Sequence, residues 1–593
     1  MSRIPVFLLI TTIISIAALF NFWVFPISSS PINHRYNVGD QVPLFVNKVG
    51  PLNNPSETYE YFDLPFCPPD KLIRRRESLG EVINGDRLTN TRYDIKFQEN
   101  KVAEIVCTKT LGREEVVRFR NAIQRDSYFQ MYYDDLPFWG FIGKVEGESL
   151  IPDLERPRSY LFTHVEFTVL YNGNHVIEVH AFSDPNHVVD ITEDAEVNVQ
   201  FTYSATWNAT SEQFADRMNR YSRPSSLLPI QHLHWFSVIN SIAIVMLSVG
   251  LLVILYWWNN RSDLRKYSAG EEDDTEVGWT CIDGDVFRCP PFLSLFCAIL
   301  GCGTQIFLMA CGLFVLTSLG LLEHYFHANL WTAVIFMYTM TSVIAGYTAA
   351  SFHCQFSEAG WEKSVFLTGV LFTGPVFFVT SILNTVAISY GAMAALPFGT
   401  IIVMLLIYAF ITIPFLALGG ILGHRYSPRN SVPYSKRCFR EIPPLNWYAK
   451  IHSQMFLGGL LPFSGILVEL HLFYASLWSH KLFTLPSILF ITFTILVLLT
   501  VILSIGLTYI QLSMEDSQWC WRPVMRGGST AIFMFIYSVY FYSRSDMSGV
   551  MQLLFFLGYN VCICYAFFLM FGMISFYTSS MFIYRIYHAV KSE

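Results

Sequence analysis

The chain has 593 residues, of which 52% are hydrophobic, 16% aromatic and only 14% charged, and its mean hydropathy is +0.38. This composition is too apolar for a soluble domain of such length and predicts a protein that crosses the lipid bilayer several times. The formal net charge is −7, and no basic stripe interleaved with aromatic residues occurs. Nucleic acid is therefore excluded as an expected partner.

The first 30 residues have the layout of a secretory signal peptide. A single basic residue, Arg3, precedes a long apolar run and a small-residue end, where we predict cleavage. The run at 4–25 is also long enough to cross a bilayer, so an uncleaved signal-anchor is the alternative. In both cases the basic end stays in the cytoplasm and the following residues enter the lumen.

Residues 31–234 form the one long hydrophilic region and are expected to fold as a luminal domain. Alternating segments at 164–171 and 174–182 flank Asn172-Gly173, a pair that tolerates positive φ, and this predicts a β-hairpin. Residues 197–207 alternate in the same way. We therefore predict a β-sandwich-like luminal domain.

Three features of this domain bear on its chemistry. Cys67 and Cys107 are its two cysteines, and in an oxidising lumen they either pair as a disulfide or stay as buried thiols. Asn208 begins its sole glycosylation sequon, so modification there would support the luminal orientation. Asp134-Asp135 is interpreted as a hydrogen-bonded turn rather than an acid/base pair, because adjacent residues of an extended segment point to opposite faces.

Nine apolar segments follow and are predicted to be transmembrane helices across residues 235–583. They lie at about 235–257, 292–320, 331–352, 365–390, 395–421, 455–477, 485–510, 527–543 and 549–583. With a luminal first domain, most Lys and Arg residues outside the segments, including Arg522 and Arg526, fall in cytoplasmic connections. The odd number of spans places the tail, 584–593, in the cytoplasm.

Glu469 is the polar residue of greatest interest in the predicted spans. It lies near the middle of the sixth span with His471 two residues away, and an intramembrane ionisable group is a candidate functional site. Gly374-Pro375, Pro414 and Pro462 interrupt spans four to six, as in transporters with broken helices, although prolines that only shape a bundle are commoner. A transporter or channel for an ion or small solute, using Glu469, is therefore the alternative function.

Motifs for catalysis and cofactor binding are missing from the sequence. It has no G-x-S-x-G elbow, P-loop, H-E-x-x-H or Gly-rich dinucleotide turn. Glu323-His324 with His327 is better explained as a helix cap than as a metal site, and Cys281 and Cys289 have poor zinc spacing. We expect no enzyme activity, no cofactor and no metal.

Several stretches resemble, in order, the transmembrane 9 superfamily, the nonaspanins. The resemblance is carried by HRYNVGDQVPLFVNKVGPLNNPSETYEYFDLPFC at 34–67, LGEVINGDRL at 79–88, YFQMYYDDLPFWGFIG at 128–143, HWFSVINS at 234–241, VGWTCIDGDVFRCP at 277–290, REIPPLNWY at 440–448, LLPFSGILVEL at 460–470 and MEDSQWCWR at 514–522. It runs from the start of the luminal domain to the last residue. Ser464-Gly465 and Cys520 are small departures from the family pattern.

The resemblance implies a signal peptide, a luminal domain, nine spans and residence in Golgi and endosomal membranes. It also implies a role in localising other membrane proteins, notably cargo with glycine-rich transmembrane helices. The family ends in a Lys-x-Asp/Glu signal that binds the COPI coat, and Lys591 and Glu593 match it at the predicted cytoplasmic C-terminus. Cargo contact is expected through glycine-lined packing and polar groups such as Glu469. The sequence leaves the cargo and any oligomeric state open.

Overall fold

The computed structural model describes residues 34–147, 157–220, 237–251 with 253, 254, 257 and 261, 286–322, 327–427, 450–479, 486–514, 516 and 519–590. The predicted signal peptide, the acidic and basic connections at 271–274 and 428–449, Cys281, Glu323-His324 and the tail residues Lys591 and Glu593 lie outside these residues.

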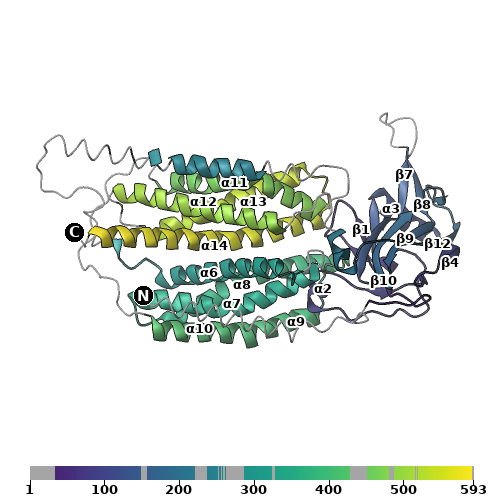
Figure 1. The fold of residues 1–593 in the computed structure, drawn as a ribbon, viewed down its shortest axis with the longest axis horizontal. Coiled ribbons are helices and arrows are strands. Elements are labelled where there is room, and N and C mark those ends of the chain that lie inside the picture. The colour runs from purple at the N-terminus through teal and green to yellow at the C-terminus, as the bar shows by residue number, and fades with distance from the viewer. Residues whose placement is uncertain are drawn as a thin grey trace, which may run out of the picture.

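A β-rich N-terminal domain stands at one end of a long helical bundle, and the described end of the last helix lies at the opposite end (Figure 1). The first sheet of this β domain has the strand order β2-β1-β5-β6, and β3 also pairs with β1. The second sheet has the order β10-β9-β12-β4, and the third has the order β11-β8-β7. The strands are β1 Leu44–Pro51, β2 Tyr59–Glu60, β3 Thr89–Asn90, β4 Lys101–Leu111, β5 Ser127–Tyr133, β6 Leu136–Phe141, β7 Gly143–Glu146, β8 Arg158–Phe162, β9 His164–Asn172, β10 His175–Ser183, β11 Val188–Asp190 and β12 Val197–Ala209.

The first two sheets share one hydrophobic core, as the prediction of a β-sandwich-like domain requires. Val46 and Met131 come from the first sheet and Phe167 and Phe201 from the second, and all four side chains are buried. The predicted hairpin is β9–β10, with the turn shifted by one residue so that Asn172 pairs with His175. Gly173 has φ +58°, the left-handed conformation that this turn needs.

Short helices complete the domain. They are η1 Tyr61–Asp63, α2 Leu79–Ile83, α3 Arg113–Gln124 and η2 Phe214–Arg220. Helix α3 was not predicted, yet its Val116, Phe119 and Ile123 recur at helical spacing and are its buried residues. Glu115 accepts a hydrogen bond from the backbone N–H of Gly112, which stabilises the first turn of α3.

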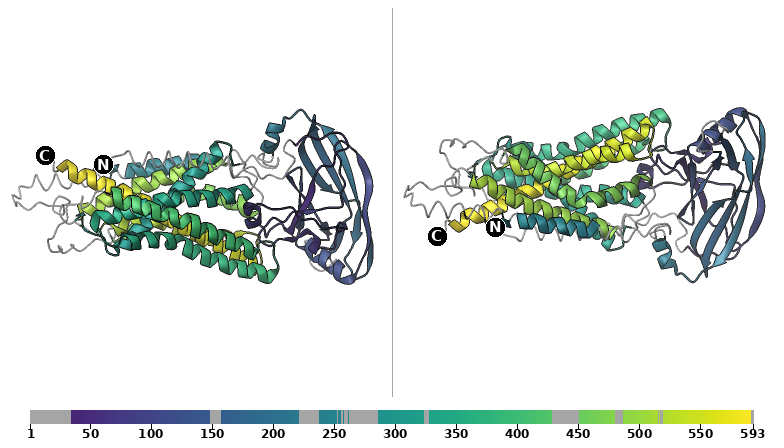
Figure 2. Two further views of the ribbon diagram at one scale, coloured as in Figure 1. Left: turned by 90° about the horizontal axis from the view of Figure 1, so that it is seen from below. Right: turned by 90° about the horizontal axis from the view of Figure 1, so that it is seen from above.

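The bundle consists of long apolar helices that run side by side (Figure 2). They are α6 Leu293–Ser318, α7 His327–Phe356, α8 Trp361–Tyr390, α9 Phe398–Ile407, the π-helical turn η4 Tyr408–Thr412, α10 Ile413–Tyr426, α11 Ile451–Ser479, α12 Pro486–Ser513, α13 Trp521–Arg544 and α14 Val550–Val590. A shorter apolar helix at Ser237–Leu251 lies within the first predicted span. Each of the nine predicted segments therefore contains helical residues.

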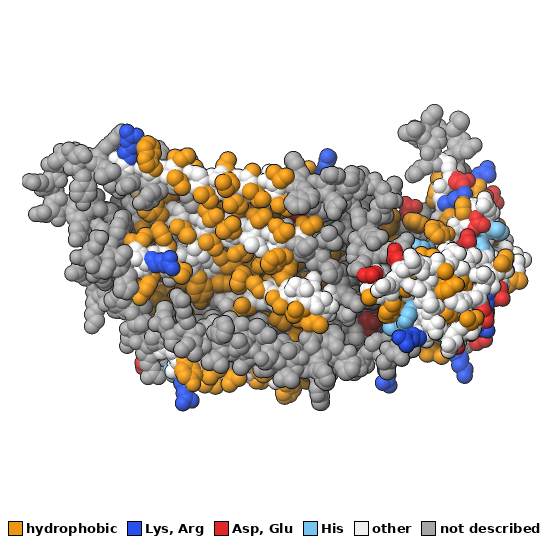
Figure 3. Space-filling model, viewed as in Figure 1, with side chains coloured by type: hydrophobic (Ala, Val, Ile, Leu, Met, Phe, Trp, Pro, Cys, Tyr) orange, Lys and Arg blue, Asp and Glu red, His pale blue; other side chains and the backbone are white. Residues whose placement is uncertain are grey.

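Seven of the described helices, counting α9 to α10 as one, are long and apolar enough to cross a membrane. Helix α13 is not among these seven, and its first turns carry Arg522 and Arg526. It begins at Trp521, six residues before the predicted span, so both arginines lie on the helix and not in a connection. On the face of the molecule seen in Figure 3, hydrophobic side chains predominate on the described part of the bundle, whereas acidic side chains gather on the β domain.

The bundle has two halves, which we call the first half, α6 to α10, and the second half, α11 to α14. Helix α7 packs along α10 and α6 in the first half, and α13 packs along α14 and α11 in the second. Helix α14 also contacts α6 and α8 and so joins the halves. In the short apolar helix, Ser241 donates a hydrogen bond to the carbonyl of Gly465 on α11 at 2.5 Å.

Candidate functional site

Helices α8 and α9 expose more of their apolar surface than the rest of the bundle. Only 11% of the span windows in Trp361–Tyr390 and Phe398–Tyr426 is buried, against 28% to 56% in the other five. Helix α9 buries none of its side chains, and Phe398 and Phe410 in this segment are 77% and 74% exposed. We call the exposed apolar side chains of α8, α9 and η4 the α8–α9 surface; its members include Phe366, Phe377, Phe378, Phe398, Leu405 and Phe410.

A π-helical turn with a tyrosine tether connects this surface to the bundle. Tyr408 in η4 donates a hydrogen bond to the carbonyl of Gly369 on α8 at 2.7 Å, and Thr373 lies 3.1 Å from the same hydroxyl. Single π turns inside α-helices recur at functional sites. On the N-terminal side of Tyr408, the residues of α9 are not packed in the interior of the bundle.

The prolines in spans four to six shape helices without breaking them. Helix α8 continues through Pro375, and α11 through Pro462. Pro375 has no N–H to give to the carbonyl of Leu371, and Tyr565 on α14 donates to that carbonyl instead, at 2.8 Å. The freed backbone group is thereby satisfied between the two halves, which favours the interpretation of these prolines as packing elements.

The glycines of α10 are occupied by neighbouring helices of the same chain. A Cβ on Gly419 would overlap the carbonyl oxygen of Val343, and one on Gly423 would lie 2.6 Å from that of Tyr347. On the facing helix α7, a Cβ on Gly346 would overlap the carbonyl oxygen of Leu416. These glycines permit close packing of α7 and α10. The expected glycine-lined cargo surface is therefore not formed by this run.

The β domain contacts the connections of both halves directly. In the α8–α9 connection, Met393 donates its backbone N–H to the carbonyl of Thr58 at 2.8 Å. In the α13–α14 connection, the N–H of Ser548 binds Asn54 Oδ1 at 3.1 Å. At the start of α14, Gln552 Oε1 accepts from the N–H of Ser56 at 3.1 Å. One segment of the domain, 54–58, thus positions both connections.

The second half has a polar interior. Ser504 on α12 hydrogen-bonds to Ser575 and Ser579 on α14, at 2.9 Å and 2.8 Å, and Thr508 lies 2.8 Å from Ser579. Nearer the β domain, Tyr474 donates to Asn560 Oδ1 at 2.7 Å. Polar groups are costly inside a membrane protein, so such an interior points to a function or to packing specificity.

Glu469 and His471 lie on different sides of α11. Glu469 is 3% exposed and belongs to the buried interior. His471 is exposed, and its Nδ1 lies 2.9 Å from the hydroxyl of Tyr537 on α13. Residues two apart on a helix do not face each other, so the structure does not bring these two candidates into one site.

Arg526 is a polar residue that the sequence interpretation assigned to a connection. Among the described residues it is the largest fully buried side chain, 1% exposed, and donates to Gln454 Oε1 at 3.3 Å and Thr508 Oγ1 at 3.0 Å. Cations are assigned to loops because burying a charge is costly. Here the facing helices supply hydrogen-bond partners, and these permit the burial of Arg526. The run Arg526-Gly527-Gly528 directly before an apolar stretch was the available signal.

The predicted turn at Asp134-Asp135 is the connection of the β5–β6 hairpin. Both residues have positive φ, 49° and 64°, and Asp134 accepts hydrogen bonds from Tyr36 at 2.6 Å and Arg217 at 3.1 Å. Burial, followed by this hydrogen bond to Asp134, raises the pKa of Tyr36. Asp135 pairs separately with Arg75 at 2.9 Å. The pair is a hydrogen-bonded turn, as interpreted from the sequence.

The two cysteines of the β domain are joined, and the sequon is accessible. Cys67 and Cys107 form a disulfide with a Cα–Cα distance of 6.2 Å. It ties the segment after η1 to β4. Asn208 lies exposed near the end of β12, where a glycan has room. Its glycosylation stays a prediction.

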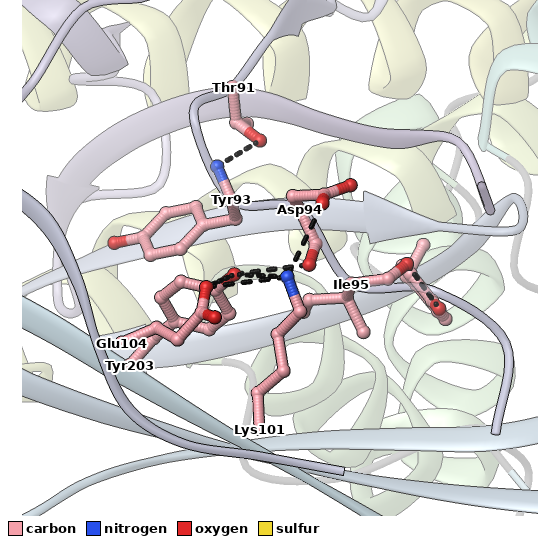
Figure 4. Close-up of polar contacts among 8 residues, drawn as sticks. Thr91, Tyr93, Asp94, Ile95, Lys101, Glu104 and Tyr203 are labelled. Carbon is pink, nitrogen blue, oxygen red and sulfur yellow. Dashed lines mark hydrogen bonds and ion pairs between the residues drawn. The ribbon is translucent and has the colours of Figure 1, made fainter. Parts of the chain in front are cut away.

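A charged cluster fixes the loop before β4 to the second sheet. Lys101 Nζ lies 3.3 Å from Asp94 and Glu104 and 3.2 Å from the hydroxyl of Tyr203 (Figure 4). Burial alone lowers the pKa of Lys101, but its hydrogen bonds to Tyr203 and Asp94 outweigh this and raise the pKa overall. The cluster is satisfied within the domain and serves its packing.

Together, a β-sandwich-like domain followed by a bundle of apolar helices defines a polytopic membrane protein. The family model described as Endomembrane protein 70 matches residues 58–550. Transmembrane 9 superfamily member 5 of Arabidopsis thaliana is 51% identical over 98% of this chain and 99% of its own length. Transmembrane 9 superfamily member 1 of Bos taurus is 38% identical, with 94% of each chain covered.

The chain therefore belongs to the transmembrane 9 superfamily, the Endomembrane protein 70 family. The family predicted from the sequence motifs is confirmed, as is the fold class of a β-rich domain followed by apolar helices. No solved structure matches the chain.

Proposed function

We propose that this protein localises other membrane proteins in the Golgi and endosomal system, with its β domain in the lumen. The observation that carries the proposal is the α8–α9 surface, an apolar helix surface that the chain's own packing leaves uncovered next to a connection held by the β domain. Transmembrane helices associate through side-chain packing, so such a surface suits the helix of a second membrane protein.

The α8–α9 surface also fits glycine-rich cargo in its shape. Phe398, Leu405 and Phe410 are large exposed side chains. A cargo helix with small residues presents a shallow groove in which such side chains can pack closely. In this arrangement the glycines are contributed by the cargo, since those of α10 are buried against α7 and α8.

Cross-linking from the membrane surface tests this arrangement. A photo-crosslinking residue at Phe398 or Phe410 should capture a defined set of membrane proteins, and loss of the protein should move that set out of its normal compartment in quantitative organelle proteomics. Ile536, an exposed apolar residue on α13, is the matched control position. Equal capture from Ile536, or an unchanged distribution of membrane proteins, would contradict the proposal.

We further propose that the COPI coat binds the C-terminal tail and retains the protein in the Golgi. The described end of α14 lies at the end of the bundle away from the β domain, so a luminal domain puts the tail on the cytoplasmic side. Changing Lys591 and Glu593 together to Ala should release the protein toward later compartments. Unchanged Golgi residence in imaging would contradict a retention role.

Transport of an ion or small solute is the second candidate, favoured by the burial of Glu469 in the polar second half. If the protein is a transporter, liposomes containing the purified protein should show solute flux, and Glu469→Gln should abolish this flux. If the protein captures cargo but gives no flux, transport is ruled out and only the sorting role remains.

A further inference from the structure

The buried layer around Arg526 has a positive charge that the described chain does not neutralise. Arg526 lies on α13, and its two hydrogen-bond partners, Gln454 on α11 and Thr508 on α12, are neutral. Among the described residues Arg526 forms no ion pair, and Asp516, the acidic residue that acts on it electrostatically, pairs with Arg522 at 2.5 Å. A buried cation without a counter-charge is strongly unfavourable.

The same layer contains hydrogen-bond donors without acceptors. The Nε of Arg526 and the Nε2 of Gln454 are both buried and have no partner among the described residues, and the hydroxyl of Thr530, one turn further along α13, is also unpartnered. Arg526 already contacts Gln454 through Nη1, so the two unmet donors belong to one layer. Buried N–H groups are rarely left unpaired in native proteins.

A guanidinium, an amide N–H and hydroxyl groups are the side chains that bind anions. Gln454, Thr508 and Thr530 are at most 1% exposed, so the described side chains of the layer are closed to the surrounding lipid. A ligand enclosed in this way is small. An anionic group satisfies both deficits of the layer, the missing negative charge and the missing acceptor.

We propose that the second half of the bundle binds a small inorganic anion of halide size at Arg526. Arg526 supplies the charge, and Gln454 and Thr530 supply hydrogen bonds. The hydroxyl chain of Ser504, Ser579 and Thr508 borders the site and holds the guanidinium through Thr508, whose Oγ1 accepts a hydrogen bond from Nη2 at 3.0 Å. This site goes beyond the sorting function and does not depend on it.

Thermal unfolding of the full-length protein in neutral-lipid nanodiscs tests the site. Chloride replaces gluconate stepwise at constant ionic strength. The midpoint temperature of unfolding should rise by a few degrees as the chloride concentration increases, and above the dissociation constant it should keep rising with the logarithm of that concentration. Arg526→Gln should lose the response. Arg544→Gln, which removes an equal charge from the exposed far end of the same helix, should keep it.

Two further measurements keep the test decisive where Arg526→Gln fails to fold. Gln454→Leu, which removes one donor, should need roughly tenfold more chloride for the same midpoint. Bromide, soaked in and measured by ion chromatography after desalting, should remain at about one ion per chain, as a single Arg526 charge requires.

Three results would overturn the proposal. Equal midpoints in chloride and gluconate would mean that water alone satisfies the donors. A rise that requires anionic lipid and ignores chloride would assign the charge to a headgroup phosphate. If Arg526→Gln folds and both it and Gln454→Leu keep an unchanged chloride response, any bound anion lies elsewhere.

Discussion

The helices within each half of the bundle pack together through different kinds of contact. In the first half, Gly346, Gly419 and Gly423 bring the backbones of α7 and α10 together. The second half also has close glycine contacts, but its interior adds the hydroxyl chain at Ser504 and the buried charge of Arg526. The first arrangement tolerates no added atom, whereas the second tolerates loss of single bonds because other partners remain.

The sharpest test of this difference is Gly419→Ala. The new methyl group would overlap the carbonyl oxygen of Val343, so α7 and α10 must separate, and we expect a destabilisation of about 3 kcal/mol. Thermal unfolding monitored by size-exclusion chromatography measures the effect. Gly399→Ala on α9, where a Cβ meets nothing within 4 Å, is the control and should change little.

Ser504→Ala tests the polar interior of the second half. Ser504 contacts Ser575 and Ser579, and its removal leaves one chain of hydroxyls incomplete, with an expected loss of about 1 to 2 kcal/mol. The control is Ser543→Ala, whose exposed hydroxyl binds only the carbonyl of Tyr540. A loss as large as that of Gly419→Ala would abolish the proposed difference between the halves.

Tyr565→Phe tests the bond that joins the halves. Without its hydroxyl, the Leu371 carbonyl freed by Pro375 loses its donor, and about 1 kcal/mol should be lost. In Pro375→Ala the backbone supplies an N–H to that carbonyl, so Tyr565→Phe should cost less in this background. Additive effects in the double-mutant cycle would show that the two residues are not coupled.

The β domain should respond to pH through His164. Burial, and then the charge of nearby His187, lowers the pKa of His164 from 6.5, while its ring nitrogens lie 2.8 Å from Thr202 and 3.0 Å from Ser204. The folded state therefore favours the neutral ring. Stability should be full above pH 6.5 and fall as the pH decreases below it, because the unfolded chain binds the proton more readily.

Thermal unfolding at a series of pH values measures this effect, which should be the smallest of the four, below about 1 kcal/mol. His164→Gln should flatten the profile between neutral and mildly acidic pH. His452→Gln, at an exposed histidine near the start of α11, is the control and should leave it unchanged. A profile that is equally steep in both variants would assign the pH dependence to other groups.

Periodicity and length predicted the parts of the fold that depend on local patterns. The β9–β10 hairpin and the apolar helices follow from alternation and from apolar runs. The parallel pairing of β9 with β12 joins residues far apart in sequence, so no local pattern specifies it.

The candidate site could be predicted only in part. Burial of Glu469 follows from its place in an apolar segment, but the occupation of the α10 glycines by α7 depends on tertiary packing. Arg526 was assigned to a connection because charge count cannot distinguish a loop cation from one whose helix neighbours provide hydrogen bonds. Exposure of α9 likewise depends on which helices the chain places beside it.

The segment 54–58 of the β domain acts as a strap across the two halves. Thr58 binds Met393 of the first half, and Asn54 and Ser56 bind Ser548 and Gln552 of the second. Rocking of one half against the other, the usual motion of alternating-access carriers, would have to release one side of this strap. A disulfide between cysteines placed at Asn54 and Ser548 would therefore lock any such cycle while leaving the outer α8–α9 surface free for partners.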